Sequence, residues 1–169
     1  KYIFSYFRHY ANCKRKHSEH GLGSSVVLTF AHKLAENYSG RCFCFYIDNF
    51  FTGLPLLREM SALNFGCTGT IRSNRVENCP VVSRQFEKER RGSINSYINS
   101  DKSKLIVVQW KDNAVVRMAS NTHGVSPTRS ARRWSTADKK HITVDMPYSI
   151  NMYNSFMGGT DQMDRNVAQ

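Results

Sequence analysis

The chain has 169 residues, of which 40% are hydrophobic and 12% aromatic, so it is long enough for one domain with a sizeable core and too apolar for a disordered chain. Its formal net charge of +11 favours a polyanionic partner, either nucleic acid or an anionic membrane surface. Because no apolar stretch approaches the roughly 20 residues of a membrane span and no signal peptide opens the sequence, nucleic acid is the preferred partner and no membrane association is expected.

The first half of the chain alternates between strand-like and helix-like patterns. Apolar residues recur at helical spacing after residue 25 and again over 53–64, and Ser24 or Ser25 is the predicted N-cap of the first helix. The segment "GRCFCFYID" is apolar nearly throughout, as expected of a strand covered on both faces of a sheet. The predicted order is strand 1–10, basic loop 11–22, helix from residue 25, strand 41–48, helix 53–64 and strand 66–72, which is an α/β signature.

The second half has a different character. A charged, partly helical connection leads to "SINSYINSDKSKLIVVQWKDNAVVRMASN", which predicts a β-meander with turns at 99–102 and 111–113. Residues 124–140 are polar, basic and loop-like, "HITVDMP" is short and extended, and Pro147 begins the last element.

The cysteines and histidines do not suggest a zinc site. The five cysteines contain no CxxC pair, so a zinc ribbon or finger is not expected, and their use suits a reducing compartment. Cys42 and Cys44 alternate along one predicted strand and are interpreted as core thiols. The six histidines are interpreted as surface residues near solvent or phosphate.

Asp48 ends the apolar strand just before a helix. A buried, unpaired carboxylate is costly, so Asp48 is expected to lie at an exposed strand end, to be hydrogen-bonded, or to bind a cation. Asp161 and Asp164, in "GGTDQMD", are three residues apart and share a face if the segment is helical, so they repel each other unless a cation or a basic side chain neutralises them. An exposed helix start, where Asp is favoured by the dipole, is the alternative.

Two long blocks, "YIDNFFTGLPLLREMSALNFGCTGTIRSNRVENCP" and "YNSFMGGTDQMD", closely resemble the piggyBac family of DDE/D transposases and their domesticated derivatives. The resemblance runs through nearly the whole chain and includes "GLGSSVVLTFAHKL". It implies a ribonuclease H-like mixed sheet flanked by helices, with a β-rich insertion before the last catalytic helix. It further implies DNA cutting and joining with carboxylate-bound Mg²⁺, for which Mn²⁺ can substitute. Three regions follow: a core over 1–72, the insertion over 73–146 and the start of the last helical segment over 147–169.

The resemblance also assigns residues. Asp48 matches the second catalytic aspartate and metal ligand, Asp161 the third, and Asp164 a nearby accessory acid. We expect the carboxylates of Asp48 and Asp161 to lie about 4–7 Å apart, as two-metal chemistry requires. Arg72 and Arg75 match a block close to DNA.

The family's first catalytic aspartate would fall just upstream of Lys1, and its zinc domain would follow Asp164. We therefore interpret the chain as a fragment cut at both ends, inactive on its own, of a protein that is homodimeric and nuclear in its full-length form. Three functions stay open. They are an active transposase that acts on transposon ends and target DNA, a domesticated non-catalytic DNA-binding protein, and a decayed transposon remnant.

Basic and aromatic residues outside these blocks are further candidates for DNA contact. Trp110 alternates within a strand and is interpreted as core, whereas Trp134 in "RSARRWS" is either core or a base-stacking residue. The densest basic loop is either solvated or in contact with phosphates; its residues are Arg129, Arg132, Arg133, Lys139 and Lys140.

Overall fold

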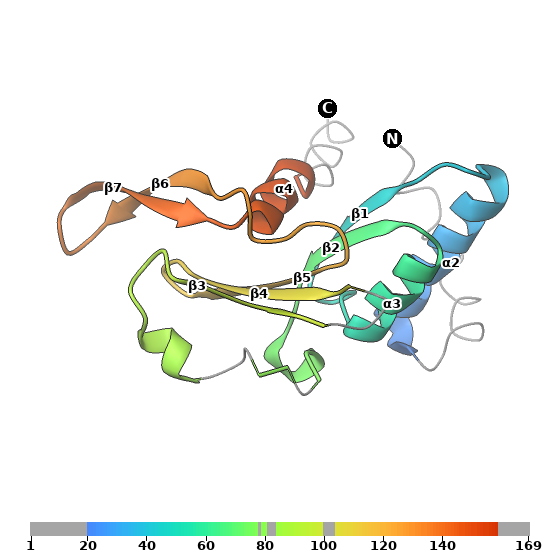
Figure 1. Ribbon diagram of the computed structural model, residues 1–169, viewed down its shortest axis with the longest axis horizontal. Helices are drawn as coiled ribbons and strands as arrows, with labels where there is room; N and C mark the ends of the chain where they lie inside the picture. Colours follow the sequence, from blue (N-terminus) through green and yellow to red (C-terminus); the bar gives the residue numbers. More distant parts are fainter. Residues whose placement is uncertain (1–19, 78, 81–83, 100–103, 159–169) are drawn as a thin grey trace, which may run out of the picture.

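A mixed five-stranded sheet and a separate two-stranded ribbon organise the computed structural model, which describes residues 20–158 except 78, 81–83 and 100–103 (Figure 1). The elements in chain order are α2 (Gly21–Asn37), β1 (Cys44–Ile47), α3 (Leu54–Ala62), β2 (Gly66–Thr70), the 3₁₀ helices η3 (Ser73–Arg75) and η4 (Arg84–Lys88), β3 (Ile94–Ile98), β4 (Ile106–Lys111), β5 (Val115–Ser120), β6 (Arg129–Ser135), β7 (Lys140–Met146) and α4 (Tyr148–Phe156).

The five-stranded sheet has the order β1-β2-β5-β4-β3. β1 and β2 are parallel, with Ile47 opposite Gly69, and α3 makes the crossover between them. The other pairs are antiparallel. The predicted α/β class is thus confirmed, and the strands predicted at 41–48 and 66–72 lie in one sheet. The strand predicted over residues 1–10 lies outside the described residues.

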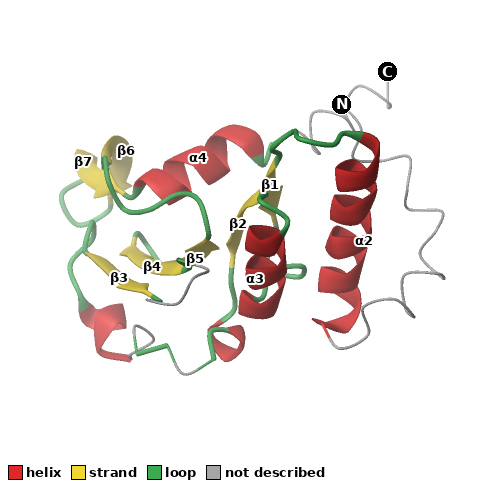
Figure 2. Ribbon diagram, turned by 45° about the vertical axis from the view of Figure 1, so that its right-hand side comes forward, coloured by secondary structure: helices red, strands yellow, loops and turns green. Residues whose placement is uncertain are grey.

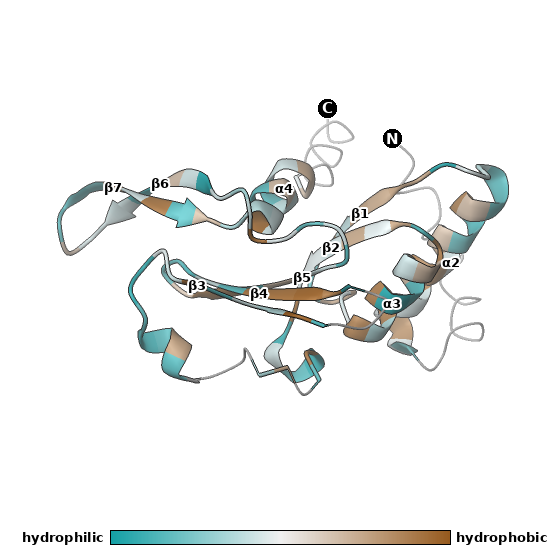
Figure 3. Ribbon diagram, viewed as in Figure 1, coloured by the Kyte–Doolittle hydropathy of each residue, from teal (hydrophilic) through white to brown (hydrophobic). Residues whose placement is uncertain are grey.

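Two hydrophobic layers cover opposite faces of this sheet (Figure 2). Neighbouring residues of β4 separate them, because successive side chains of a strand point to opposite faces. Val107 belongs to the core beneath α2 and α3, and Val108 belongs to the core beneath α4 and the β6–β7 ribbon. Figure 3 shows the hydrophobic run along β4 that serves both layers. No helix in the described part of the chain is long and apolar enough to span a membrane.

The helix α2 begins earlier than its sequence predicts. Its first residue is Gly21, so neither Ser24 nor Ser25 is the N-cap, and residues 21 and 22 belong to the helix rather than to a loop. The Ser25 hydroxyl donates to the carbonyl of Gly21 at 2.7 Å. The Ser24 hydroxyl donates outside the helix, to the carbonyl of Phe51 at 3.0 Å. Both serines resemble N-cap residues in sequence. In the structure, however, the Ser25 bond stays within α2, and the Ser24 bond connects α2 to the turn after β1.

Two cysteines depart from the core assignment. Cys42 and Cys44 are both exposed, whereas Cys67 is buried. The strand β1 begins only at Cys44, so Cys42 precedes it, and Cys44 lies on the opposite face from Ile47, which packs in the core beneath α2 and α3.

The meander is confirmed in β3, β4 and β5, and it extends the sheet of β1 and β2 because Gly69 pairs with Ala119 of β5. The region boundaries at residues 72 and 146 stay predictions. The prediction of a loop over 124–140 is wrong, because β6 lies within this range and pairs with β7. The segment "HITVDMP" was predicted to be extended, and β7 confirms that prediction. Only Ala131 and Ser135 of β6 are buried, so this strand has little hydrophobic signal in its sequence.

Candidate functional site

Asp48 is the first residue after β1 and begins a tight turn. Its carboxylate oxygen Oδ1 accepts the backbone N–H of Phe50 at 2.9 Å. Its main-chain carbonyl accepts the N–H groups of Phe51 and Thr52, at 3.0 and 3.2 Å, and the Thr52 hydroxyl at 2.9 Å. Within the described part of the chain no donor is hydrogen-bonded to the second carboxylate oxygen of Asp48. The turn therefore fixes the backbone of Asp48 and leaves one oxygen for another partner.

Close packing from α2 and β2 holds this turn in place. A Cβ atom on Gly23 would lie 2.6 Å from the carbonyl oxygen of Phe50, and one on Gly69 would lie 2.6 Å from the carbonyl oxygen of Ile47. Real Cβ contacts are not this short, so only glycine allows the helix and the neighbouring strand to approach so closely. Thr52, at the end of this turn, is fully buried.

Arg72 and Arg75, both predicted to bind DNA, donate hydrogen bonds to the turn that follows Asp48. The half-buried Arg75 donates from Nη1 to the carbonyls of Asn49, Phe50 and Thr52, at 3.1, 2.8 and 3.3 Å. The exposed Arg72 donates from Nε to the Asn49 side-chain oxygen at 3.0 Å. Both arginines thus lie beside Asp48, and Arg75 has a structural function that sequence alone does not reveal.

Tyr46 lies two residues before Asp48, so the side chains of both residues point to the same side of β1. The Tyr46 ring stacks on Phe156 of α4 with ring centres 4.8 Å apart, and its hydroxyl lies 2.9 Å from Nε2 of His123. Burial, followed by the negative charges of Cys44 and Tyr148, raises the pKa of Tyr46. Burial lowers the pKa of His123. His123 is therefore an internal contact, not the simple surface histidine that was expected.

Tyr153 of α4 lies near the end of the same face. Burial first, and also the charge of Asp48, raise the pKa of Tyr153, and the nearby Thr70 hydroxyl partly offsets the increase. The Thr70 hydroxyl is buried and has no hydrogen-bond partner of standard geometry in the described structure. Sequence reasoning missed Tyr46 and Tyr153. Their signals were the two-residue spacing from Asp48 and the helical spacing of Tyr153 and Phe156.

The predicted acids Asp161 and Asp164 lie outside the described residues, so the expected 4–7 Å between Asp48 and Asp161 stays a prediction. In the part of the chain that is described, no three His, Cys, Asp or Glu side chains gather to hold a metal. Asp48 itself fits one hard-oxygen ligand of a magnesium site, since one carboxylate oxygen is left without a hydrogen-bond partner. The described residues thus supply a single acidic ligand, and Asp161 would have to supply the next.

The ribbon of β6 and β7 sorts the basic residues by face. Arg129 and Arg132 are exposed. Arg133 points inward, donates from Nε to Asp112 at 2.9 Å, and lies 5.5 Å from the ring centre of Trp110. Trp110 is buried, as predicted, and Trp134 is 51% exposed, which excludes the core interpretation for it.

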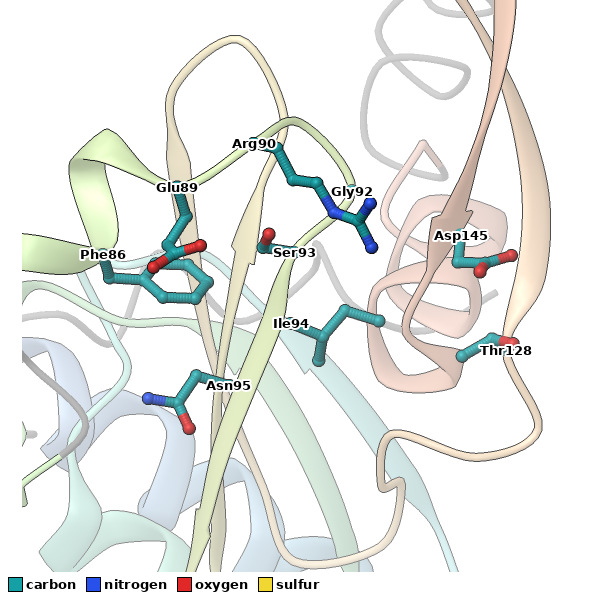
Figure 4. Close-up of a pocket in the computed structure, with 9 residues that line it drawn as sticks. All are labelled: Phe86, Glu89, Arg90, Gly92, Ser93, Ile94, Asn95, Thr128 and Asp145. Carbon is teal, nitrogen blue, oxygen red and sulfur yellow. The ribbon is translucent and has the colours of Figure 1, made fainter.

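A hollow of about 500 Å³ opens at the start of β3, away from Asp48 (Figure 4). Its walls come from the segment around η4, from β3 and from the ribbon, and none of the predicted catalytic or DNA-binding residues lines it. The lining includes Phe86, Glu89, Arg90, Ile94 and Asp145.

The family model described as Transposase IS4 matches residues 1–169. Human PiggyBac transposable element-derived protein 3 is 38% identical over 157 residues, which cover 92% of this chain and 26% of that protein. Human PiggyBac transposable element-derived protein 2 is 32% identical over 149 residues, covering 88% and 25%. The chain therefore spans about a quarter of the length of these curated relatives.

One solved structure is also similar. It is the cryo-EM structure of the piggyBac transposase synaptic complex with hairpin DNA, with a TM-score of 0.49 and 23% identity, covering 87% of this chain and 27% of that one.

Proposed function

The chain belongs to the family of piggyBac-type transposases, and on that premise we propose that it forms part of the ribonuclease H-like catalytic core of a protein that binds DNA and cuts and joins its strands. The observation that carries this proposal is the state of Asp48. It directly follows β1, the turn after it is held by α2 and by two arginines, and one carboxylate oxygen has no hydrogen bond in the described structure.

Asp48 and Asp161 would hold the metal, Mg²⁺ or Mn²⁺, and Asp164 would assist them. When bound, the metal would activate the attacking hydroxyl and stabilise the leaving oxygen of a phosphodiester. The chain's own residues fix the geometry: the turn orients the Asp48 backbone, and Arg72 places a positive charge beside it. An exposed guanidinium at this position fits a DNA phosphate next to the cleaved bond.

The DNA itself would also contact the outer face of the β6–β7 ribbon. Arg132 and Trp134 are exposed there, Arg129 is exposed at the first residue of β6, and Lys139 and Lys140 are exposed in and next to the hairpin turn. Lysine and arginine bind phosphates without reading sequence, so this contact would be strongly salt-dependent. We further propose that the full-length protein is a homodimer that works in the nucleus. A fluorescent fusion excluded from the nucleus would contradict the location, and a monomer in sedimentation with DNA would contradict the dimer.

The test of the proposed function is metal-dependent strand cleavage by the intact protein that carries this sequence. The substrate is a duplex with the terminal repeat of the element that encodes it. Asp48→Asn removes the ligand charge and keeps the side-chain shape, and it should abolish cleavage while DNA affinity is retained. Glu59→Gln, which removes a carboxylate charge at an exposed position of α3 on the other side of the sheet from the ribbon, is the control and should leave cleavage unchanged.

Two other results would redirect the proposal. DNA binding by the parent protein without any Mg²⁺- or Mn²⁺-dependent cleavage would favour the domesticated, non-catalytic alternative, for which the exposed basic ribbon alone would suffice. Cleavage that survives Asp48→Asn would show that Asp48 is not a metal ligand.

A further inference from the structure

The β6–β7 ribbon, at the left of Figure 1, carries a large apolar side chain, Trp134, on its outer face. Along β6 the buried Ala131 and Ser135 alternate with the exposed Arg132 and Trp134, which therefore point away from the core beneath the ribbon. Trp134 is 51% exposed, and neither core cluster of the described residues contains it. A single exposed tryptophan is common in proteins, so its function has to be inferred from what surrounds it.

Contacts on the ring and on the backbone hold Trp134 in place. Its partner in the antiparallel register is His141, whose ring meets the indole edge to face, with ring centres 5.2 Å apart and planes at 76°. The Trp134 carbonyl accepts Nη1 of Arg91 at 2.7 Å. Asp112 pairs with both Arg91 and Arg133, at 2.6 and 2.9 Å, which fixes the donor as well. A side chain held in this way loses little conformational freedom when it binds a ligand.

Exposed cationic side chains surround Trp134. They lie two residues before it on β6 and in or next to the hairpin turn, and they are Arg132, Lys139 and Lys140. The acid of the same turn, Asp138, accepts a hydrogen bond from the Ser135 hydroxyl at 2.8 Å. Asp145 lies at the other end of the ribbon, opposite Ser130. An aromatic ring among cations is the combination with which proteins bind single-stranded nucleic acid, because the ring stacks on a base while the cations contact phosphates.

The bases of an intact duplex cover each other's faces, so an aromatic side chain can stack only on a base that has left the stack. We propose that Trp134 is a stacking site for an unpaired base of the bound DNA, that His141 positions its ring, and that Arg132 contacts a neighbouring phosphate. This inference rests on the proposed function, which brings DNA to the ribbon. It deepens that function, because it makes DNA with an unpaired base the preferred ligand of the ribbon.

The test measures, for the intact protein, the ratio of its affinities for a duplex with one unpaired thymine and for the same duplex fully paired. Fluorescence anisotropy gives both affinities, with EDTA present so that no strand is cut. The parent should prefer the unpaired base by about 10-fold, as expected for one base stacked on one aromatic ring. Trp134→Ala should reduce the ratio to about 1, and Trp134→Tyr, which keeps an aromatic ring, should retain most of it.

A matched control and a second variant exclude indirect effects. Tyr97 is 41% exposed and pairs with Val107 of the core beneath α2 and α3, so it lies on the other face of the sheet from the ribbon. Tyr97→Ala should therefore keep the full preference. Trp134→Leu keeps an apolar side chain without an aromatic face, and it should lose the preference as Trp134→Ala does, which decides the matter if the alanine variant fails to fold.

A fluorescent base reports stacking directly. With 2-aminopurine at the unpaired position, emission should fall when the parent or Trp134→Tyr binds and should stay bright with Trp134→Leu. A parent that binds the paired duplex without any preference, or a preference that survives in both Trp134→Ala and Trp134→Leu, would overturn the inference. Either result would leave the proposed function intact, since its own test is the loss of cleavage in Asp48→Asn. Failure of the parent to bind either duplex would instead contradict the proposed DNA contact, and the inference with it.

Discussion

Arg132 and Arg133 are neighbours on β6, and their substitution should affect different properties: Arg133→Ala the stability of the fold, and Arg132→Ala the binding of DNA. Arg133 donates to Asp112 at 2.9 Å from a side chain that is 31% exposed, and its guanidinium lies 5.5 Å from the ring centre of the buried Trp110. A hydrogen bond between charged groups contributes about 1.5–3 kcal/mol, and a partly desolvated cation–π contact about 0.5–2 kcal/mol. Partial exposure and the remaining Arg91–Asp112 pair at 2.6 Å reduce the net loss. We expect Arg133→Ala to destabilise the fold by about 2 kcal/mol.

Arg132 points to solvent, so Arg132→Ala should change the free energy of unfolding by less than about 0.5 kcal/mol. It should instead reduce the slope of log K against log salt for DNA binding by about 0.9, the value for one phosphate contact. Chemical denaturation measures the first quantity, and DNA titration at several salt concentrations measures the second. If Arg133→Ala leaves stability unchanged and reduces the salt slope as much as Arg132→Ala does, the assignment of the two arginines to opposite faces is wrong.

Three further outcomes follow from the packing. Gly69→Ala should destabilise the protein by about 2 kcal/mol in denaturant titration, because the added Cβ would lie 2.6 Å from the Ile47 carbonyl oxygen; an unchanged midpoint would contradict this close approach. Cys67, whose pKa burial raises to about 12, should resist iodoacetamide in the folded protein while the exposed Cys42 reacts, as mass spectrometry can show. Burial alone would raise the pKa of Asp112, but hydrogen bonds from its two arginines lower it below 3.8. Its contribution to stability is therefore present above about pH 4 and lost as the pH falls through the lowered value, so the stability deficit of Asp112→Asn should shrink below pH 4.

Local sequence patterns were sufficient to predict a helix that packs one face against a single hydrophobic layer. In α3, Leu56 and Met60 are fully buried at the predicted spacing. Asn64 then adopts a positive φ of 57°, which ends the helix near the predicted residue. Both the stripe and the stop depend on residues within a few positions of each other, so the sequence states them directly.

The strand β6 shows why other elements could not be predicted. Its sequence alternates exposed and inward residues, but the inward ones include Arg133 beside the small Ala131 and Ser135. An arginine at an inward position contradicts the usual binary pattern. It is acceptable here because Asp112, from the distant β4–β5 turn, neutralises it. A contact between a strand and a turn 21 residues earlier in the sequence has no local signal, and the basic segment therefore predicts a loop.

The same difference applies to the candidate site, and it changes how the basic charge should be interpreted. The position of Asp48 at the end of a strand was predicted correctly, because an apolar run that stops at a carboxylate is a local pattern in the sequence. The function of Arg75 depends on three carbonyls of the segment after Asp48, and neither the fold of that segment nor its close contact with α2 has a signal near Arg75 in the sequence. Two of the five arginines predicted to bind DNA, Arg75 and Arg133, are thus engaged with groups of the protein itself. A net charge of +11 therefore overstates the number of side chains available to phosphates, and the exposed face of each element decides which arginines can reach DNA.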